Sequence, residues 1–330
     1  MRSRRIIGLI SLVLIGAIAL SGCSPKGEDV DTSLEDQTYR IGIVQLTEHP
    51  ALDDARQGFV DGLKELGVNI EPDYQNAQGD IPNTISIVQK FIKDDVDLIY
   101  AIATPAAQSA KQATTEIPIL FSAVTDPVEA EIVSDWEDVG GNVTGTSDMA
   151  PTESQLRMFN EIDPDIETIG ILYNTSEPNS EIQVREVKEL APDIGLKVEV
   201  IGVNNVNELP QAIDALVKKV DALYMLTDNM MAASVELTSR KAIENNMITV
   251  SAEETQVKGG LLITNGLSYY ELGKQTARMA KEILVDGKEP SSIPVGLAEQ
   301  TVTTVNVKTL EALGLDPDLP IFKDVIEVGE

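Results

Sequence analysis

Histidine and cysteine, which often carry enzyme chemistry, are scarce in this chain. Its 330 residues include one histidine, His49, and one cysteine, Cys23. A Cys–His pair would need both of them, and a Ser–His–Asp triad could use only His49. The sequence has no glycine-rich dinucleotide loop, Walker sequence or G-x-S-x-G turn, and no His and Cys cluster with metal-site spacing. We therefore expect no catalytic residues, no cofactor and no metal, in a protein that is not an enzyme.

Polar residues instead recur directly after the predicted strands. Ligands of open parallel sheets bind at the carboxyl ends of the strands, where helix N-termini expose backbone N–H groups. One segment that directly follows a predicted strand is Ala252-Glu253-Glu254. The candidate ligand-binding residues taken from such positions are Gln45, His49, Thr104, Ala106, Thr125, Asp126, Asn174, Glu177, Asn179, Ser180, Thr227, Asp228 and Asn229.

The same residues have a structural explanation that stays open. Thr, Ser, Asn and Asp are preferred helix N-caps, and proline is preferred at the first helical position. Asp228 in particular could cap a helix over 232–245. Taken together, however, the segments supply hydroxyl, amide and carboxylate groups at edges that would face each other. A small zwitterion needs that mixture, with donors for its carboxylate and an acceptor for its ammonium group.

Two series of alternating elements must position these residues. The first has strands at 40–45, 69–75, 96–103 and 117–124, with helices at 51–66, 81–93 and 106–115. The second has helices at 151–162, 181–191, 209–217 and 232–245, with strands at 168–173, 197–203, 222–226, 248–251 and 261–264. A helix at 269–284, a strand near 301–307 and a helix at 310–313 follow. Alternation of apolar strands with helices predicts two α/β units with parallel sheets.

The first residues predict export and anchoring. Three arginines precede the apolar stretch 6–20, which is short for a membrane span and fits a signal peptide over 1–22. Leu20-Ser21-Gly22-Cys23 resembles the bacterial lipobox, which implies lipid on the Cys23 thiol. The acidic segment 23–38 has no hydrophobic periodicity and is typical of a flexible tether. We expect an extracytoplasmic protein held to the cell membrane as a lipoprotein.

Charge narrows the choice of partners. The formal net charge is −29, and no cluster of Lys and Arg interleaved with aromatic residues is present. Nucleic acid and anionic lipid surfaces would repel such a chain, so we expect no nucleic-acid partner. Aromatic residues make up 4% of the chain, and Trp136 lies in an acidic segment, so no ring-stacking platform for a sugar is apparent.

Several segments resemble one known family. The run IGIVQLTEHPALDDARQGFVDGLKELG, the loops AIATPAAQSA, FSAVTDPV and ILYNTSEPNS, and the segments GNVTGTSD, LYMLTDN and SYYELGKQTARMAKEILVDGKEP are similar to the substrate-binding lipoproteins of ABC transporters assigned to aromatic amino acid uptake. The resemblance covers about residues 39–307. It implies a type I periplasmic-binding-protein fold, with two Rossmann-like lobes joined by three crossing segments. Lobe 1 would comprise 39–145 and 266–298, and lobe 2 would comprise 146–265 and 299–330.

The resemblance also implies partners and roles. A small ligand, tryptophan or tyrosine in particular, would be captured between closing lobes and passed to ABC permease and ATPase subunits. Asp228 would pair with the ligand ammonium group, whereas Thr104, Ala106, Asn179 and Ser180 would serve its carboxylate and polar contacts. Gln45 and His49 would border its side chain. A ligand-sensing lipoprotein, or a binder of a nucleoside or sugar, remains the alternative.

Overall fold

The structure is a computed structural model in which residues 37–329 are described. The predicted signal peptide, Cys23 and nearly all of the predicted tether lie outside the described residues. Thr38, the last residue assigned to the tether, begins the first strand. Among residues 37–329, no helix combines the length and hydrophobicity that a membrane crossing requires.

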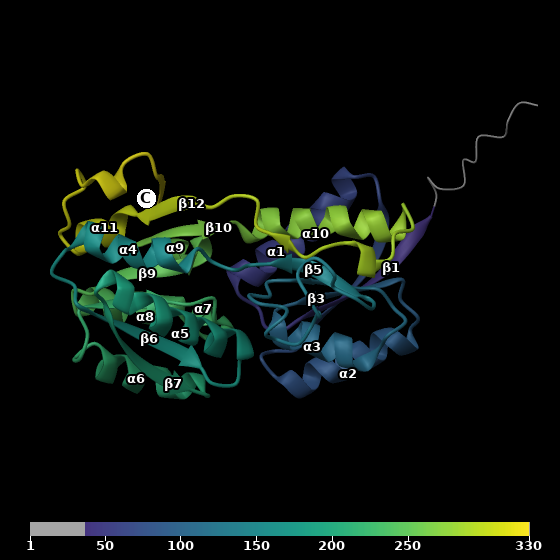
Figure 1. Cartoon of the computed structure of the whole chain (residues 1–330), viewed down its shortest axis with the longest axis horizontal. Coiled ribbons are helices and arrows are strands. Elements are labelled where there is room, and N and C mark those ends of the chain that lie inside the picture. Colours follow the sequence, from purple (N-terminus) through teal and green to yellow (C-terminus); the bar gives the residue numbers. More distant parts are fainter. Residues whose placement is uncertain (1–36, 330) are drawn as a thin grey trace, which may run out of the picture. The chain divides into compact units, whose positions relative to one another are not determined.

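Two separate sheets organise residues 37–329 (Figure 1). The six-stranded sheet has the order β11-β5-β4-β3-β1-β2, and all its strand pairs are parallel. Its strands are β1 (Thr38–Gln45), β2 (Asn69–Asn76), β3 (Leu98–Ile102), β4 (Ile119–Ser122), β5 (Val143–Ser147) and β11 (Gly296–Leu297). In β3 every residue is buried, as expected for a parallel strand covered on both faces.

The seven-stranded sheet has the order β13-β12-β10-β9-β8-β6-β7. Its strands are β6 (Thr168–Asn174), β7 (Lys197–Val203), β8 (Ala222–Met225), β9 (Ile248–Glu253), β10 (Ile263–Leu267), β12 (Val302–Asn306) and β13 (Ile326–Val328). One pair departs from the predicted parallel arrangement, because β12 runs antiparallel to β10. Parallel neighbours need a crossover connection that returns the chain to the edge of the sheet where the first strand began. The chain instead enters β12 directly from lobe 1, so β12 can run antiparallel to β10.

Helices flank both sheets. We call the six-stranded sheet with its helices lobe 1, and the seven-stranded sheet with its helices lobe 2. Lobe 1 contains α1 (Pro50–Glu65), α2 (Ile81–Lys93), α3 (Thr104–Ala113) and α10 (Tyr269–Leu284). Lobe 2 contains α4 (Thr152–Ile162), α5 (Pro178–Leu190), α6 (Leu209–Leu216), α7 (Asn229–Ala233), α8 (Val235–Glu244), α9 (Glu254–Lys258) and α11 (Val307–Ala312).

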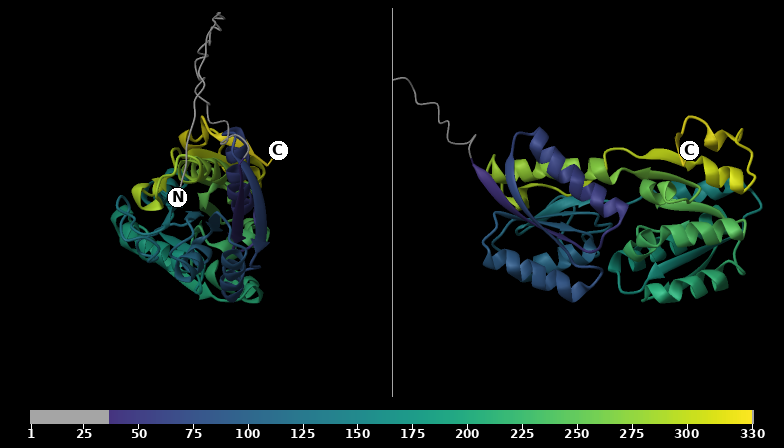
Figure 2. Two further views of the ribbon diagram at one scale, coloured as in Figure 1. Left: turned by 90° about the vertical axis from the view of Figure 1, so that its right-hand side faces the viewer. Right: turned by 180° about the vertical axis from the view of Figure 1, so that it is seen from behind.

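The chain passes between the two sheets three times. It leaves the six-stranded sheet after β5, returns between β10 and α10, and leaves again between β11 and β12 (Figure 2). Two predicted boundaries fall inside strands: the one between 145 and 146 lies in β5, which continues to Ser147, and the one between 265 and 266 lies in β10, which continues to Leu267. Both sheets are thus completed by segments from the last third of the chain.

One predicted helix is two helices in the structure. The segment expected to be helical over 232–245 contains the end of α7 and the whole of α8, separated at Ser234. Helix α7 starts earlier, at Asn229, because Asp228 has an extended backbone and its side chain accepts a hydrogen bond from the N–H of Met231. Asp228 therefore caps α7, as a helix N-cap does.

The most extensive contact between helices in lobe 1 joins segments about 200 residues apart. Helices α1 and α10 cross closely because glycines occupy their contact face. A Cβ on Gly58 would lie 2.0 Å from the carbonyl oxygen of Tyr270, and one on Gly273 would lie 2.1 Å from that of Ala55. No side chain fits at either position unless the backbones move apart.

We therefore expect Gly273→Ala to destabilise the protein. The added methyl group meets backbone, so α1 and α10 must separate, at a cost of about 1–3 kcal/mol in the free energy of unfolding. Urea denaturation followed by circular dichroism measures this cost. Lys64→Ala, at an exposed position of α1, is the control and should change stability by less than about 0.5 kcal/mol. A Gly273→Ala protein as stable as the wild type would contradict the close crossing.

Candidate functional site

A small cavity lies between the lobes. His49, Ala51, Leu52 and Ala123 of lobe 1 line one side, and Asp148 and Tyr269, at two of the crossings, line another. The lobe 2 lining residues are Asn179, Thr227, Asp228, Asn229, Ala232, Glu253 and Gln256. Its volume is about 10 Å³, close to the space that one water molecule requires. The lobes are therefore nearly closed on each other.

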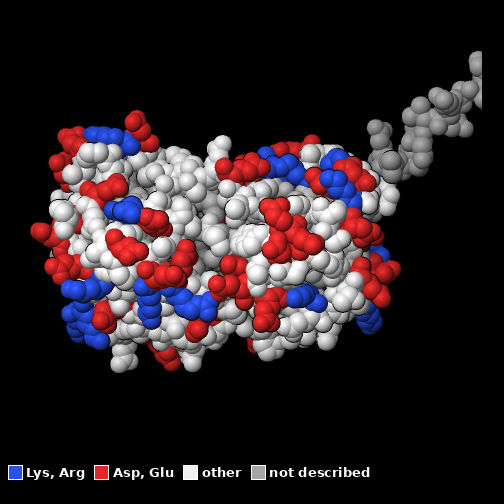
Figure 3. Space-filling view, in the orientation of Figure 1, with Lys and Arg blue, Asp and Glu red and all other residues white. Residues whose placement is uncertain are grey.

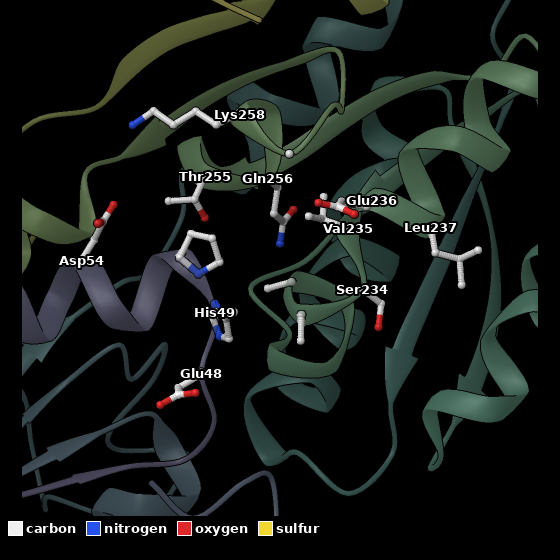
Figure 4. Close-up of a pocket in the computed structure, with 14 residues that line it drawn as sticks. Glu48, His49, Asp54, Ser234, Val235, Glu236, Leu237, Thr255, Gln256 and Lys258 are labelled. Carbon is white, nitrogen blue, oxygen red and sulfur yellow. The ribbon is translucent and has the colours of Figure 1, made fainter. Parts of the chain in front are cut away.

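A larger groove of about 620 Å³ adjoins this cavity and shares His49, Ala232 and Gln256 with it. Figure 4 shows His49 at the start of α1, with Thr255 and Gln256 of α9 on the other side of the groove. Acidic side chains outnumber basic ones along it: Glu48, Asp54 and Glu236 accompany Lys258.

Asp228 holds together the lobe 2 half of the cavity. It follows β8, is fully buried, and accepts hydrogen bonds from three elements. Its Oδ2 accepts from the N–H of Asn174 at the end of β6 (2.6 Å) and from the hydroxyl of Ser180 in α5 (2.7 Å). Its Oδ1 accepts from the N–H of Met231 in α7 (2.9 Å). Both oxygens of the carboxylate are thus occupied within lobe 2.

Glu177 extends this network towards lobe 1. Its carboxylate accepts from the side-chain amide of Asn174 (3.0 Å) and from that of Asn229. Asn229 in turn has its Oδ1 3.1 Å from Nε2 of His49, at the start of α1. Because the Asn229 amide nitrogen donates to Glu177, its oxygen faces His49, and Nε2 must carry the proton. A hydrogen bond therefore crosses the cleft from His49 to Asn229.

A second hydrogen-bonded group spans the lobes near the crossings. The hydroxyl of Thr125 lies 3.2 Å from that of Thr227 in lobe 2, and 3.1 Å from Oδ1 of Asp148. The other oxygen of Asp148 accepts from the hydroxyl of Tyr269 (2.6 Å). Since Asp148 follows β5 and Tyr269 begins α10, this group joins two of the crossings to both lobes.

The start of α9 supplies two further cavity residues. Glu253 ends β9 and caps α9, accepting from the N–H and hydroxyl of Thr255 and from the N–H of Gln256. Gln256 is buried, and its Nε2 donates to the carbonyl oxygen of Leu226 (2.9 Å).

Two alanines in lobe 1 have an unusual backbone. Ala103 follows β3 with φ of 83°, and Ala123 follows β4 with φ of 57°. Residues with a Cβ rarely adopt positive φ, which is costly and is found most often at functional sites. Ala123 lines the cavity directly, and Ala103 precedes the first turn of α3.

Burial shifts the titration of the acidic groups around the cavity. It raises the pKa of Glu253 to about 7. Burial, reinforced by the neighbouring charge of Asp228, raises the pKa of Glu177 to about 7 as well. The pKa values of Asp148 and Asp228 are also raised by burial. Burial lowers the pKa of His49, which favours its neutral form.

The structure brings together many of the thirteen predicted ligand-binding residues. Those that line the cavity are His49, Asn179, Thr227, Asp228 and Asn229. Those that hydrogen-bond to a lining residue are Thr125, Asn174, Glu177 and Ser180. These nine share one network, and one of them, Asp228, both caps a helix and lines the cavity.

Four predicted residues neither line the cavity nor hydrogen-bond to a residue that lines it. Gln45 donates to Asp53 and accepts from Arg56 within lobe 1. The Asp126 carboxylate closes a turn by accepting from the N–H groups of Val128 and Glu129. Thr104 and Ala106 are buried in the first turn of α3, and the Thr104 hydroxyl has no hydrogen-bond partner.

Four polar lining residues were not among the predictions: Asp148, Glu253, Gln256 and Tyr269. Glu253 lies in a segment that was predicted to follow a strand, so its position in the sequence already indicated that it could lie at the site. Asp148 and Tyr269 lie next to crossings, which alternation of strands and helices does not locate. Gln256 lies within the first turn of a short helix and carries no signal in sequence.

The described residues contain no group of three or more His, Cys, Asp or Glu side chains arranged to hold a metal ion. On the surface, acidic side chains are distributed over both lobes on the face seen in Figure 3, with smaller groups of Lys and Arg between them. That face carries no extended basic area of the kind that binds nucleic acid.

Comparisons with known proteins agree with this architecture. Residues 40–324 match the family described as ABC transporter substrate binding protein. The tyrosine-binding protein of Clostridioides difficile (strain R20291) is 41% identical over 324 residues, which cover 95% of this chain and 93% of that protein. The predicted fold class, two α/β lobes of the type I periplasmic-binding-protein fold, is confirmed by such relatives.

Two solved structures are similar along their whole length. An ABC domain in complex with L-Trp from Streptococcus pneumonia has a TM-score of 0.84 at 32% identity, covering 88% of this chain and 100% of that one. The ligand-free, open structure of a substrate binding protein with adhesive properties from Clostridium difficile has a TM-score of 0.68 at 44% identity, covering 88% and 99%. The family consists of extracytoplasmic binding proteins, not of enzymes. This chain belongs to the ABC transporter substrate-binding protein family.

Proposed function

We propose that this protein captures an aromatic amino acid between its lobes and delivers it to an ABC importer. The observation that carries the proposal is the cavity itself, to which both lobes contribute polar groups next to small apolar side chains. Lipid on Cys23 would hold the protein at the outer face of the cell membrane, where the permease, driven by its ATPase subunits, receives the ligand.

Relatives support the ligand class. A tyrosine-binding protein is 41% identical to this chain, and a structure with L-Trp has the same fold at 32% identity. An aromatic amino acid needs donors for its carboxylate, acceptors for its ammonium group and apolar surface for its ring. Ala51, Leu52, Ala123, Ala232 and the ring of Tyr269 supply apolar surface around the cavity.

Capture requires the lobes to open. The cavity of about 10 Å³ is far smaller than an amino acid, so ligand enters only when the lobes separate. The contacts that separation would break include His49 with Asn229, Thr125 with Thr227, and Arg185 of α5 with Glu129 of lobe 1. The higher TM-score with the L-Trp complex than with the open structure, at lower sequence identity, supports a nearly closed arrangement here. Ligand would add contacts to both lobes and so favour closure.

The N-terminus of α3 is our candidate for the ligand carboxylate. The hydroxyl of Thr104 is buried without a partner, and the N–H of Ala106 lies in the first turn, where backbone donors have no intrahelical acceptor. The positive end of the helix dipole would favour an anionic group at this place. The strained backbone of Ala103 immediately before the helix is consistent with a ligand contact there.

We expect aromatic amino acids to stabilise the protein without its signal peptide. A ligand present at 100 times its dissociation constant adds about 2.7 kcal/mol to the free energy of unfolding, which raises Tm by several degrees. A thermal-shift panel of the twenty amino acids with sugars and nucleosides measures this effect. A panel in which a sugar or nucleoside raises Tm and no amino acid does so would contradict the proposal.

Because the His49–Asn229 hydrogen bond crosses the cleft, we expect His49→Ala to weaken ligand binding by at least about twofold, the effect of losing one neutral hydrogen bond. Isothermal titration calorimetry measures the affinity. Thr84→Ala, which removes a buried hydroxyl that bonds to Ser109 within lobe 1, is the control and should leave the affinity unchanged. Equal affinities for His49→Ala and the wild type would show that the His49–Asn229 hydrogen bond does not contribute to ligand binding.

The buried carboxyl groups predict how stability depends on pH. Glu253 has a folded-state pKa of about 7, above its ordinary value of 4.5. The folded state therefore binds a proton that the unfolded state has already released, and stability falls as pH rises from about 4.5 to 7. Urea midpoints measured across this range should decrease. Glu253→Gln should flatten the decrease, whereas Glu116→Gln, at an exposed position, should not. A Glu253→Gln protein with the same pH dependence of stability as the wild type would contradict the assignment.

A further inference from the structure

Three buried polar atoms without hydrogen-bond partners belong to residues that line the cavity. They are Nδ1 of His49, Oδ1 of Asn179 and Oε1 of Gln256. Half of the unpartnered buried side-chain atoms found in residues 37–329 are thus at this one place. Folded proteins pair nearly all buried polar groups, so such a concentration requires an explanation.

Hydrogen bonds to the backbone fix the orientation of the Asn179 and Gln256 carboxamide groups. The Nδ2 of Asn179 donates to the carbonyl oxygen of Thr227 (2.9 Å), and the Nε2 of Gln256 donates to that of Leu226 (2.9 Å). Two consecutive carbonyls after β8 therefore hold the two amino groups. With their nitrogens fixed in this way, both carboxamides have only their oxygens free, and these oxygens can only accept.

His49 is an acceptor at the same cavity. Its Nε2 donates to Asn229, whose orientation is set by Glu177. The ring is neutral, because burial lowers its pKa, so Nδ1 carries a lone pair and no hydrogen. The three unpartnered atoms are thus all acceptors, two from lobe 2 and one from lobe 1.

The carboxylates that line the cavity are already hydrogen-bonded. Both oxygens of Asp228 and both of Asp148 accept from protein donors, and the same holds for Glu253. No Lys or Arg is among the lining residues. The cavity therefore offers free neutral acceptors and has no positively charged side chain in its lining. Such a place favours a small cation that only donates, and a primary ammonium group has three N–H donors.

We propose that Asn179, Gln256 and His49 form the subsite for the ligand's primary ammonium group. This inference rests on the proposed function and replaces the ion pair expected between Asp228 and the ammonium group. Asn179 and Gln256 accept two N–H groups in lobe 2, and His49 accepts the third when the lobes close. Asp228 does not contact the ammonium group but positions β6, α5 and α7 around the cavity through its hydrogen bonds. Specificity follows: the site requires an unsubstituted amine, because a methyl group on nitrogen removes a donor.

The test compares an aromatic amino acid with its deaminated analogue in wild-type protein and in Gln256→Met. For tyrosine the analogue is 3-(4-hydroxyphenyl)propanoate, which keeps the ring and carboxylate. We expect Gln256→Met to bind the amino acid at least about tenfold more weakly, the effect of losing a hydrogen bond to a charged group. Its affinity for the deaminated analogue should be unchanged.

Gln155→Met is the matched control. Gln155 is an equally buried carboxamide of lobe 2, but all its groups are paired: Nε2 donates to Asn265 and Ala252, and Oε1 accepts from Tyr224. This variant should lose stability and keep the wild-type ratio of the two affinities. An unchanged ratio in Gln256→Met, whether both affinities fall together or neither changes, would overturn the subsite.

A second measurement needs no variant. N-methylation of the amino acid should weaken its binding to the wild-type protein by at least about tenfold, because one of three charged hydrogen bonds is lost. Equal affinity for the two ligands would overturn the subsite even if Gln256→Met failed to fold. A wild-type protein that bound no aromatic amino acid would instead contradict the proposed function, so the two failures are distinguishable.

Discussion

The burial of the Asp228 carboxylate is the interaction on which the site depends. An unpaired charge at such depth would cost several kcal/mol, so its position requires donors from its surroundings. Those donors come from the end of β6, the first turn of α5 and the first turn of α7. Three elements are thereby held at fixed positions around one side chain. Without that arrangement Asn179, Thr227 and Asn229 would have no common orientation towards lobe 1.

Closure follows from the same network. Asn229 has its amide nitrogen on Glu177 and its oxygen on His49, so the internal order of lobe 2 is directly coupled to a contact with lobe 1. The Thr125, Asp148 and Tyr269 group does the equivalent near the crossings. The contacts that these two groups make between the lobes, His49 with Asn229 and Thr125 with Thr227, are hydrogen bonds between neutral side chains, each of modest net energy in water. A closed arrangement of that kind can be reopened by thermal motion, and a bound ligand can shift its population.

Much of the fold could be predicted from the sequence. The alternation of apolar strands with helices predicted two α/β units, and the polar positions after strands predicted nine residues that now share one network. The antiparallel β12 could not be predicted in this way, because its direction depends on the path of the crossing before it. Resemblance to a family supplied the crossings themselves. Asp148 and Tyr269, which adjoin them, were missed for that reason.

Gln256 illustrates a different limit. Its value to the site comes from an amide nitrogen bound to the carbonyl of Leu226, thirty residues earlier, and no local pattern reports such a contact. Asp228 shows the opposite case. Its residue type and place after a strand made it prominent, as a helix cap or as the partner of the ligand ammonium group, and the structure shows a cap that also lines the cavity. What sequence could not reveal was that its oxygens are already occupied.

The glycine-mediated crossing of α1 and α10 has a consequence for how the chain folds. The partner of α1 begins at Tyr269, after all but two strands of lobe 2 in the chain order. The side of α1 that carries Gly58 thus stays uncovered until most of the sequence is available, and β12 and β13 complete lobe 2 still later. Contacts of such long sequence separation slow folding. Lobe 1 lacks α10 and lobe 2 lacks β12 until the last third of the chain is available, so neither lobe can reach its final structure before then.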